Sequence, residues 1–271
     1  MRYPLLAFTV AIGLAAAPPT HAGTVGFTTD TCRNDYSTPF DVDVTPAGLS
    51  FHRTTGTPKG VFLRDGALSI DGKNVTVSKA DADALRRYEA GVRKLMPEVA
   101  SIAREAVSMG YSAMTTVTLT FAEGSQRAAM LENLKKKQAD SLRAVDEGVG
   151  AGHWSGDRMT ETFAGSVSDG VGELVGSVTS SAVTAAMSGD SSKVAALQAR
   201  AESLDKSIDR EMNKRSKALE ARAETICPQL NELADLQRGW SVRLPDGKPL
   251  ELMTIKPKGS PGDDRHDVAS F

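Results

Sequence analysis

The sequence contains very little cysteine and few aromatic residues. Two of its 271 residues are cysteine, Cys32 and Cys227, and Phe, Trp and Tyr together make up 5% of the chain. No Cys-x-x-Cys pair is present, which excludes the redox motif of that spacing. A low aromatic content beside many Ala, Leu, Ser, Lys and Glu residues is typical of long helices around a thin core.

An excess of charge of one sign is also missing. The formal net charge is −2, and loss of Arg2 with the leader described below leaves 31 Lys and Arg against 34 Asp and Glu, a net of −3. A chain so close to neutral gives no reason to expect a nucleic-acid surface. Histidine is scarce as well, and of the four residues only His52 and His153 lie away from the chain ends.

The first 22 residues have the layout of a secretory signal peptide. Arg2 precedes an apolar run from Leu5 to Ala17, and small residues lead up to Ala22. We expect cleavage after Ala22, because cleavage after Ala17 would place a proline first. The run is shorter than the about 20 apolar residues of a membrane anchor, and no later stretch is apolar enough to span a membrane. The sequence therefore predicts an exported, periplasmic protein.

Residues 23–78 carry the signals of an antiparallel β-meander. Apolar and polar residues alternate in FDVDVTPAGLSFHR, with Pro46-Ala47-Gly48 between the two halves. Asp65-Gly66 and Asp71-Gly72 separate further alternating runs, and Asp-Gly suits a type I′ hairpin turn because both central residues need positive φ. The strands expected around these pairs are Val61–Leu63, Ala67–Ile70 and Val75–Val77.

Residues 79–237 have the pattern of a helical hairpin or bundle. Ser78 and Asp81 resemble a capping box, and the helix that they open is expected to end at Pro97, since proline rarely lies deep inside a helix. A second helix should follow and include TTVTLTF, residues 115–121, although that run alternates like a strand. Further helices are expected at Gln126–Asp146, 157–187 and 192–226, with a break at 147–156.

The helix predicted at 192–226 carries an apolar stripe about 100° wide. Its heptad order is imperfect, so a bundle or coiled coil is expected without a long regular seam. The protein's own helices, a partner protein or lipid could cover the stripe. The stripe consists of Leu197, Ala201, Leu204, Ile208, Met212, Leu219, Ala223 and Ile226.

Beyond Gln237 the helical pattern fades. Residues 238–256 resemble a second hairpin, with strands at Trp240–Leu244 and Leu250–Ile255 around Pro245-Asp246-Gly247. Residues 257–271 are polar and rich in Pro and Gly, which predicts a disordered tail. Together these segments predict an α+β protein, mostly long antiparallel α-helices with a small antiparallel β region formed near both chain ends.

The passage GALSIDGKNVTVSKADADALRRYEAGVRKLMPEV resembles the YggN-like family of Gram-negative periplasmic proteins of unknown function. The matching positions are the turn Asp71-Gly72-Lys73, Tyr88, Arg93 and Leu95-Met96-Pro97, although the family pattern has Leu-Pro where this chain has Met96-Pro97. The resemblance covers most of residues 30–235, so the segment after Trp240 reads as an extension. It implies a signal peptide, an early cysteine and a late one, and it supplies no catalytic residues.

Two cysteines near opposite ends of an exported chain suggest one disulfide, Cys32–Cys227. The alternatives are two free thiols, or one thiol that serves a redox partner. A bridge would close a loop of about 195 residues and clamp the helix end before Pro228 to the N-terminal β region.

No motif for chemistry stands out, and we expect no catalytic, cofactor-binding or metal-ligating residues. Ser155, in GHWSG, is one position away from the Gly-x-Ser-x-Gly of a nucleophile elbow. The glycine pairs at 148–150 and 170–172 do not follow a strand, as a dinucleotide loop requires. The run from Asp263 to Asp267 offers no preformed metal geometry in a polar tail.

These observations favour a non-enzymatic exported protein with a binding, scaffolding or envelope-maintenance role, whose partner is an unknown protein or envelope component. One alternative is a hydrolase whose residues meet only in three dimensions, which a deep pocket lined by His52 or His153 with carboxylates would support. Another is a chaperone or lipid-associated protein that uses amphipathic helix faces.

Overall fold

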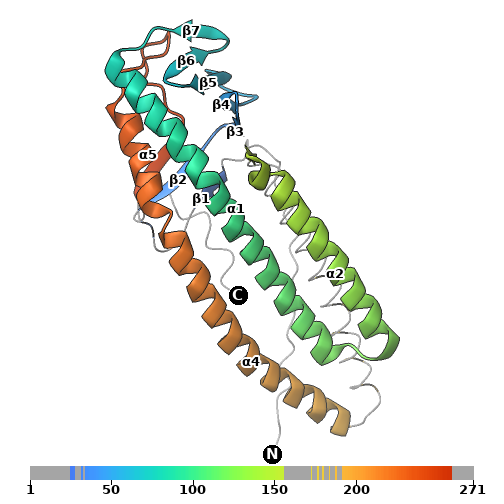
Figure 1. Ribbon diagram of the computed structural model, residues 1–271. Coiled ribbons are helices and arrows are strands. Elements are labelled where there is room, and N and C mark those ends of the chain that lie inside the picture. Colours follow the sequence, from blue (N-terminus) through green and yellow to red (C-terminus); the bar gives the residue numbers. More distant parts are fainter. Residues whose placement is uncertain are drawn as a thin grey trace, which may run out of the picture.

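The protein has an α+β fold in which two antiparallel sheets lie at one end of a set of helices (Figure 1). The computed structural model describes residues 25–27, 32, 34–155 and 191–257, with isolated positions between 172 and 187. The predicted signal peptide, most of the helix predicted at 157–187 and the predicted tail beyond Pro257 lie outside the described residues.

The larger sheet has six strands in the order β7-β6-β5-β4-β3-β8. Both Asp-Gly pairs form the predicted two-residue turns, with φ of 50° at Asp65 and 48° at Asp71. Because Ile70 pairs with Lys73 across the second turn, β7 begins two residues earlier than predicted. The strands are β3 (Asp41–Thr45), β4 (Gly48–His52), β5 (Gly60–Arg64), β6 (Ala67–Ile70), β7 (Lys73–Val75) and β8 (His153–Trp154).

The smaller sheet has three strands, β1 (Val25–Phe27), β2 (Asn34–Thr38) and β9 (Thr254–Pro257), in the order β1-β2-β9. Its C-terminal strand pairs with β2, so the end of the second predicted strand lies in this sheet and not in a hairpin over 238–256. Around the predicted turn a short hairpin does form, with a bridge between Arg243 and Pro249 and backbone bonds from the Leu244 N–H to the Lys248 carbonyl and from the Leu250 N–H to the Val242 carbonyl. The described strands therefore lie mostly in the N-terminal region, which corrects the prediction of a β region near both ends.

Side chains supplement this short backbone pairing in the segment after residue 239. The Trp240 indole N–H donates to the Leu250 carbonyl at 3.0 Å. The Gln237 amide accepts from the backbone of Leu252 and Met253 and donates to the Met253 carbonyl. These buried bonds satisfy backbone groups that a hairpin would otherwise pair, so the segment folds inward against the core.

Helix α1 (Lys79–Phe121) is 43 residues long and continues through Pro97. The prediction that a helix ends there is wrong. Met96 and Ala100 on either side of the proline are both buried in the same core. Their packing outweighs the local cost of about 3 kcal/mol that an interior proline carries. At the start of the helix, Ser78 Oγ accepts from the Asp81 N–H, as the capping pattern predicts.

The other helices pack on α1. α2 (Gly124–Glu147) folds back beside it after a link of two residues, and α4 (Ser191–Glu224) lies on its other side (Figure 1). α5 (Cys227–Gly239) continues towards the sheets after a short break. The predicted break at 147–156 contains the 3₁₀ turn η1 (Val149–Ala151) and β8, which adds to the edge of the larger sheet.

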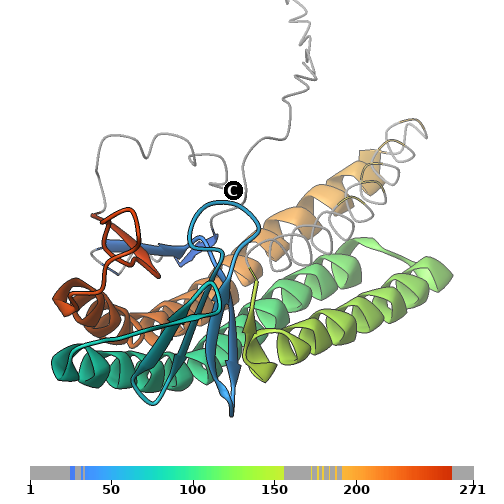
Figure 2. The same cartoon turned by 90° about the horizontal axis from the view of Figure 1, so that it is seen from above.

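Burial is described at five of the eight positions of the apolar stripe predicted on residues 192–226, while the side chains of Leu197, Ile208 and Met212 lie outside the described part. Ala223 and Ile226 are buried, Leu204 and Leu219 are half-buried, and Ala201 is exposed. Seen from above, the strands cover one face of α1, while α2 and α4 extend beyond them (Figure 2). The sheets, the first half of α1 and α5 enclose the part of the core that holds the candidate site, and the same core continues between α1 and α2.

Candidate functional site

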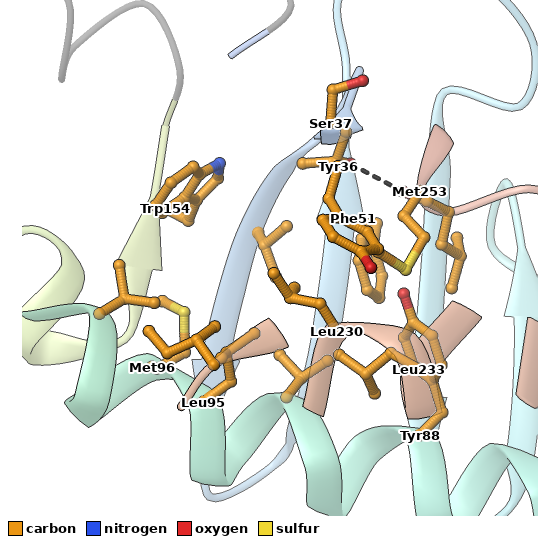
Figure 3. A pocket seen from close by; sticks show the side chains of 16 residues that line it. Tyr36, Ser37, Phe51, Tyr88, Leu95, Met96, Trp154, Leu230, Leu233 and Met253 are labelled. Atoms are coloured by element: carbon orange, nitrogen blue, oxygen red, sulfur yellow. Dashed lines mark hydrogen bonds between the residues drawn. The ribbon is translucent and has the colours of Figure 1, made fainter. Parts of the chain in front are cut away.

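An apolar pocket opens where α1 and α5 meet the two sheets (Figure 3). Its volume is about 110 Å³, of the same order as the roughly 150 Å³ apolar cavity that admits benzene. Among the described residues, none of the lining side chains carries a charge. Its lining includes Val42, Phe51, Val92, Met96, Leu230 and Met253.

Helix α1 supplies one continuous wall of the pocket. Tyr88, Val92, Leu95, Met96 and Val99 recur at helical spacing and share one face of the helix. At 1.5 Å per residue this wall is about 16 Å long. The lining therefore extends along α1 from Tyr88 to Val99.

Four lining residues carry a hydroxyl group, Tyr36, Ser37, Thr38 and Tyr88, and two of these hydroxyls already donate to other residues. Tyr36 donates to Asn231 Oδ1 at 2.5 Å, and Thr38 donates to the Leu252 carbonyl at 2.7 Å. The Tyr88 hydroxyl has no hydrogen-bond partner within the described part of the chain. Figure 3 shows this hydroxyl pointing from α1 into the pocket.

Tyr88 is held firmly and stays protonated. Its ring centroid lies 5.4 Å from that of Trp240 and 6.3 Å from that of Phe51. Only 2% of the residue is exposed. Burial raises the pKa of the Tyr88 hydroxyl well above its usual range, because the phenolate would lose its hydration. The group is therefore a neutral hydrogen-bond donor.

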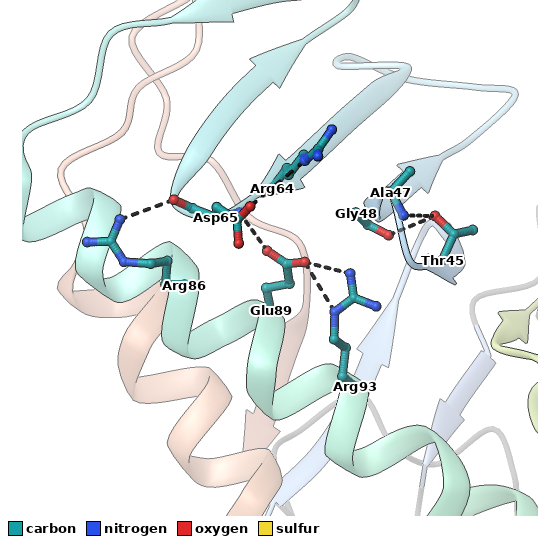
Figure 4. A network of polar contacts seen from close by, with 8 residues as sticks. All are labelled: Thr45, Ala47, Gly48, Arg64, Asp65, Arg86, Glu89 and Arg93. Atoms are coloured by element: carbon teal, nitrogen blue, oxygen red, sulfur yellow. Dashed lines mark hydrogen bonds and ion pairs between the residues drawn. The ribbon is translucent and has the colours of Figure 1, made fainter.

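Glu89, the next residue, fixes the larger sheet on α1 (Figure 4). Its side chain is buried, and it accepts from Arg93 at 2.6 Å and from the Asp65 backbone N–H at 3.0 Å. Arg86 donates to the Asp65 carbonyl at 3.1 Å. The turn between β5 and β6 is thereby tied to the helix that carries the pocket wall.

Two further interactions hold segments together at the same end of the molecule. Cys32 and Cys227 form the disulfide that the sequence predicts, with a Cα–Cα distance of 5.6 Å, and so join the segment before β2 to the start of α5. The buried Asp81 carboxylate accepts from the hydroxyl and the backbone N–H of Ser241, both at 2.7 Å. These bonds from Ser241, with those from Ser78, lower the pKa of Asp81.

The structure brings His52 and His153 to a common carboxylate away from the pocket. His153 Nδ1 lies 2.6 Å and His52 Nδ1 3.3 Å from Asp43, and both imidazoles are exposed on the larger sheet. Over the described ranges, no group of three or more His, Cys, Asp or Glu residues could hold a metal ion. Ser155 follows β8 directly, and the glycine pair at 148–150 lies at the end of α2.

A family model described as "Protein of unknown function (DUF2884)" matches residues 35–253. The chain belongs to this family. The YggN-like resemblance is consistent with the match, but the match continues past Trp240, so the segment read as an extension is part of the DUF2884 region. A search of the curated proteins and a search of the solved structures found no match.

The positions that carry the family resemblance have structural roles in this DUF2884 member. Tyr88, Leu95 and Met96 line the pocket, and Arg93 pairs with Glu89. The Asp71 carboxylate accepts from the backbone N–H groups of Lys59 and Gly60. Within the described ranges, no helix is both long and apolar enough to cross a membrane.

Sequence reasoning missed the pocket itself. Its walls come from β2, β3, β4, β8, α1, α5 and the segment before β9, which are far apart in the sequence. One local signal was present, because Tyr88 is one of four tyrosines in a chain poor in aromatics and shares a helical face with Val92, Leu95 and Val99.

Proposed function

We propose that this chain is an exported, periplasmic protein that binds a small apolar ligand in the pocket beside Tyr88 without transforming it. The observation that carries the proposal is a pocket of about 110 Å³ lined mainly by apolar side chains from both sheets, α1, α5 and the segment before β9. Concave apolar sites with a few polar groups are the usual form of small-molecule sites.

The polar groups of the lining support binding rather than chemistry. Tyr36 and Thr38 hold the walls together through their own hydrogen bonds. Tyr88 has a raised pKa, so at neutral pH it donates a proton in a hydrogen bond but does not act as a base.

Export is supported by two features. The disulfide Cys32–Cys227 is compatible with an oxidising compartment, and residues 1–22 have the layout of a signal peptide. We expect the full chain to reach the periplasm with Gly23 as its first residue, and a chain that lacks residues 2–22 to stay in the cytoplasm. Fractionation with intact-mass measurement checks this, and an uncleaved full-length product contradicts it.

The binding proposal is tested by NMR with ¹³C-methyl methionine and toluene as the probe. Met96 and Met253 line the pocket, whereas Met130 lies on α2 outside it. Toluene should shift the first two methyl signals saturably and leave that of Met130 in place. Pocket binding is wrong if Met96 and Met253 do not move.

A matched pair of variants locates the site. Val92→Phe places a larger side chain on the pocket wall and should weaken toluene binding at least about tenfold, because the added ring fills the space. Leu119→Phe, at a half-exposed position on the same helix, should bind toluene like the natural protein. Equal affinities in the two variants would place the toluene elsewhere.

A further inference from the structure

The Tyr88 hydroxyl faces the pocket and has no hydrogen-bond partner within the described part of the chain, and this carries an inference about the ligand. A hydroxyl donor in this position is available to an acceptor on a bound molecule. Two of the neighbouring hydroxyls are engaged elsewhere, since Tyr36 donates to Asn231 and Thr38 donates to Leu252.

The lining residues determine which kind of hydrogen-bond acceptor can bind to the Tyr88 hydroxyl. With no charged side chain among the described lining residues, the pocket has no cation to balance a carboxylate. An unpaired ion in such a site is strongly disfavoured. The acceptor is therefore a neutral oxygen.

The arrangement of the lining residues indicates what kind of molecule carries the acceptor oxygen. From Tyr88 the wall runs along α1 through Val92 and Met96 to Val99, about 16 Å at 1.5 Å per residue. An apolar lining that extends along α1, with the Tyr88 hydroxyl at one end of it, matches an unbranched aliphatic chain that carries its oxygen near one terminus.

Resting on the proposed function, we infer that the ligand is a neutral straight-chain carbonyl compound, a fatty ketone or fatty ester. Its carbonyl oxygen accepts from the Tyr88 hydroxyl, and its aliphatic chain lies along α1 towards Val99. Tyr88 is thus the residue that selects an oxygen-bearing chain over a plain hydrocarbon.

The test compares four probes in the same methionine NMR titration: 2-octanone, methyl octanoate, octanoate at pH 7, and toluene, which has no carbonyl. In the natural protein, the ketone or the ester should bind more tightly than octanoate. Tyr88→Phe removes only the hydroxyl, and it should weaken ketone and ester binding about five- to tenfold, the usual worth of one net hydrogen bond. Its affinity for toluene should change less than about twofold.

Thr38→Val is the matched control, because it removes a lining hydroxyl that already donates to Leu252. It should change the affinities for 2-octanone and toluene by the same factor. Retained methyl dispersion and thermal unfolding of Tyr88→Phe show that it folds.

Two results separate the two proposals. If the probes bind but Tyr88→Phe leaves the ratio of ketone to toluene affinity unchanged, or if octanoate binds best, the inference about Tyr88 is overturned while pocket binding stands. If no probe shifts Met96 or Met253, the proposed function fails, and with it the inference. Tighter binding of the ester than of the ketone, or the reverse, tells which carbonyl source the pocket fits.

Discussion

The two ends of the molecule are built differently. The head consists of both sheets, residues 79–100 of α1, α5 and the segment up to Pro257, and it holds the pocket. The arm consists of residues 101–121 of α1, α2 and α4, which extend beyond the sheets (Figure 2). In the head, buried side chains come from strands and helices together. In the arm, they form a line between helices, chiefly Val107, Tyr111, Met114, Met130, Leu134 and Val145.

The polar ties differ in the same way. The head is closed by a disulfide and by the buried groups of Asp81, Glu89 and Gln237. The described ties of the arm include exposed ion pairs, such as Arg104–Asp146 and Arg200–Glu123. Exposed pairs contribute little, whereas losing one partner of a buried pair is costly. Although the arm also contains a buried hydrogen bond between Tyr111 and Ser141, we expect the head to contribute more of the stability of the fold.

The largest effect is expected from breaking the covalent tie of the head. Cys32→Ser with Cys227→Ser opens a link between residues 195 positions apart. The free energy of unfolding should fall by up to about 5 kcal/mol, because the unfolded chain regains the entropy of that loop. Urea denaturation measures the loss, and a midpoint equal to that of the oxidised protein would show that the head does not need the bond.

A pair of leucine substitutions compares the two cores directly. Leu85, in the head, is 0% exposed, and Leu134, on α2 in the arm, is 6% exposed. Leu85→Ala should lower the free energy of unfolding by about 4 to 5 kcal/mol, and Leu134→Ala should lower it by about 2 to 3 kcal/mol, because the arm can relax around a cavity more easily. Urea denaturation again gives both values. Equal losses would argue that the arm is as tightly packed as the head.

The third prediction compares a buried carboxylate with an exposed one. Glu89→Gln leaves Arg93 without its charge partner and places an amide beside the Asp65 N–H. The free energy of unfolding should therefore fall by about 2 kcal/mol. Glu105→Gln, at the exposed pair with Arg222, should cost less than about 1 kcal/mol. Thermal unfolding at pH 7 distinguishes them, and a similar cost for both would contradict the contrast between head and arm.

The smallest effect concerns pH. Asp81 titrates near 3.8 in the unfolded chain, and its pKa in the folded protein is lower because of the bonds from Ser241. A lowered folded pKa stabilises the protein above the unfolded value, and this contribution disappears as the pH falls through the folded pKa. Thermal unfolding measured from pH 6 downwards should therefore show a loss of stability below about pH 4, and this loss should be absent in Asp81→Asn. Ser241→Ala should reduce the same loss, and an unchanged profile in both variants would rule Asp81 out.

Local signals predicted local structure well. The Asp-Gly pairs at 65–66 and 71–72 correctly predicted both tight turns, and Ser78 correctly predicted the start of α1. Each of these features depends on a few neighbouring residues. The alternating run at 115–121 was correctly assigned to a helix.

Contacts between distant segments could not be read from the sequence in the same way. Pro97 stays helical because Met96 and Ala100 pack into a core that other segments provide. The strand at Thr254–Pro257 pairs with Asn34–Thr38 rather than with its own neighbour. The pocket exists only where these segments meet, so no spacing of residues along the chain predicted it.

The disulfide has a consequence for how the molecule withstands a protease. The bond between Cys32 and Cys227 encloses α1, α2, α4 and the larger sheet in one covalent ring. A single cut within this ring, for example in the short link between α1 and α2, leaves two fragments that remain joined. A nicked molecule should therefore travel as one piece on a denaturing gel and separate into two only after a reducing agent is added.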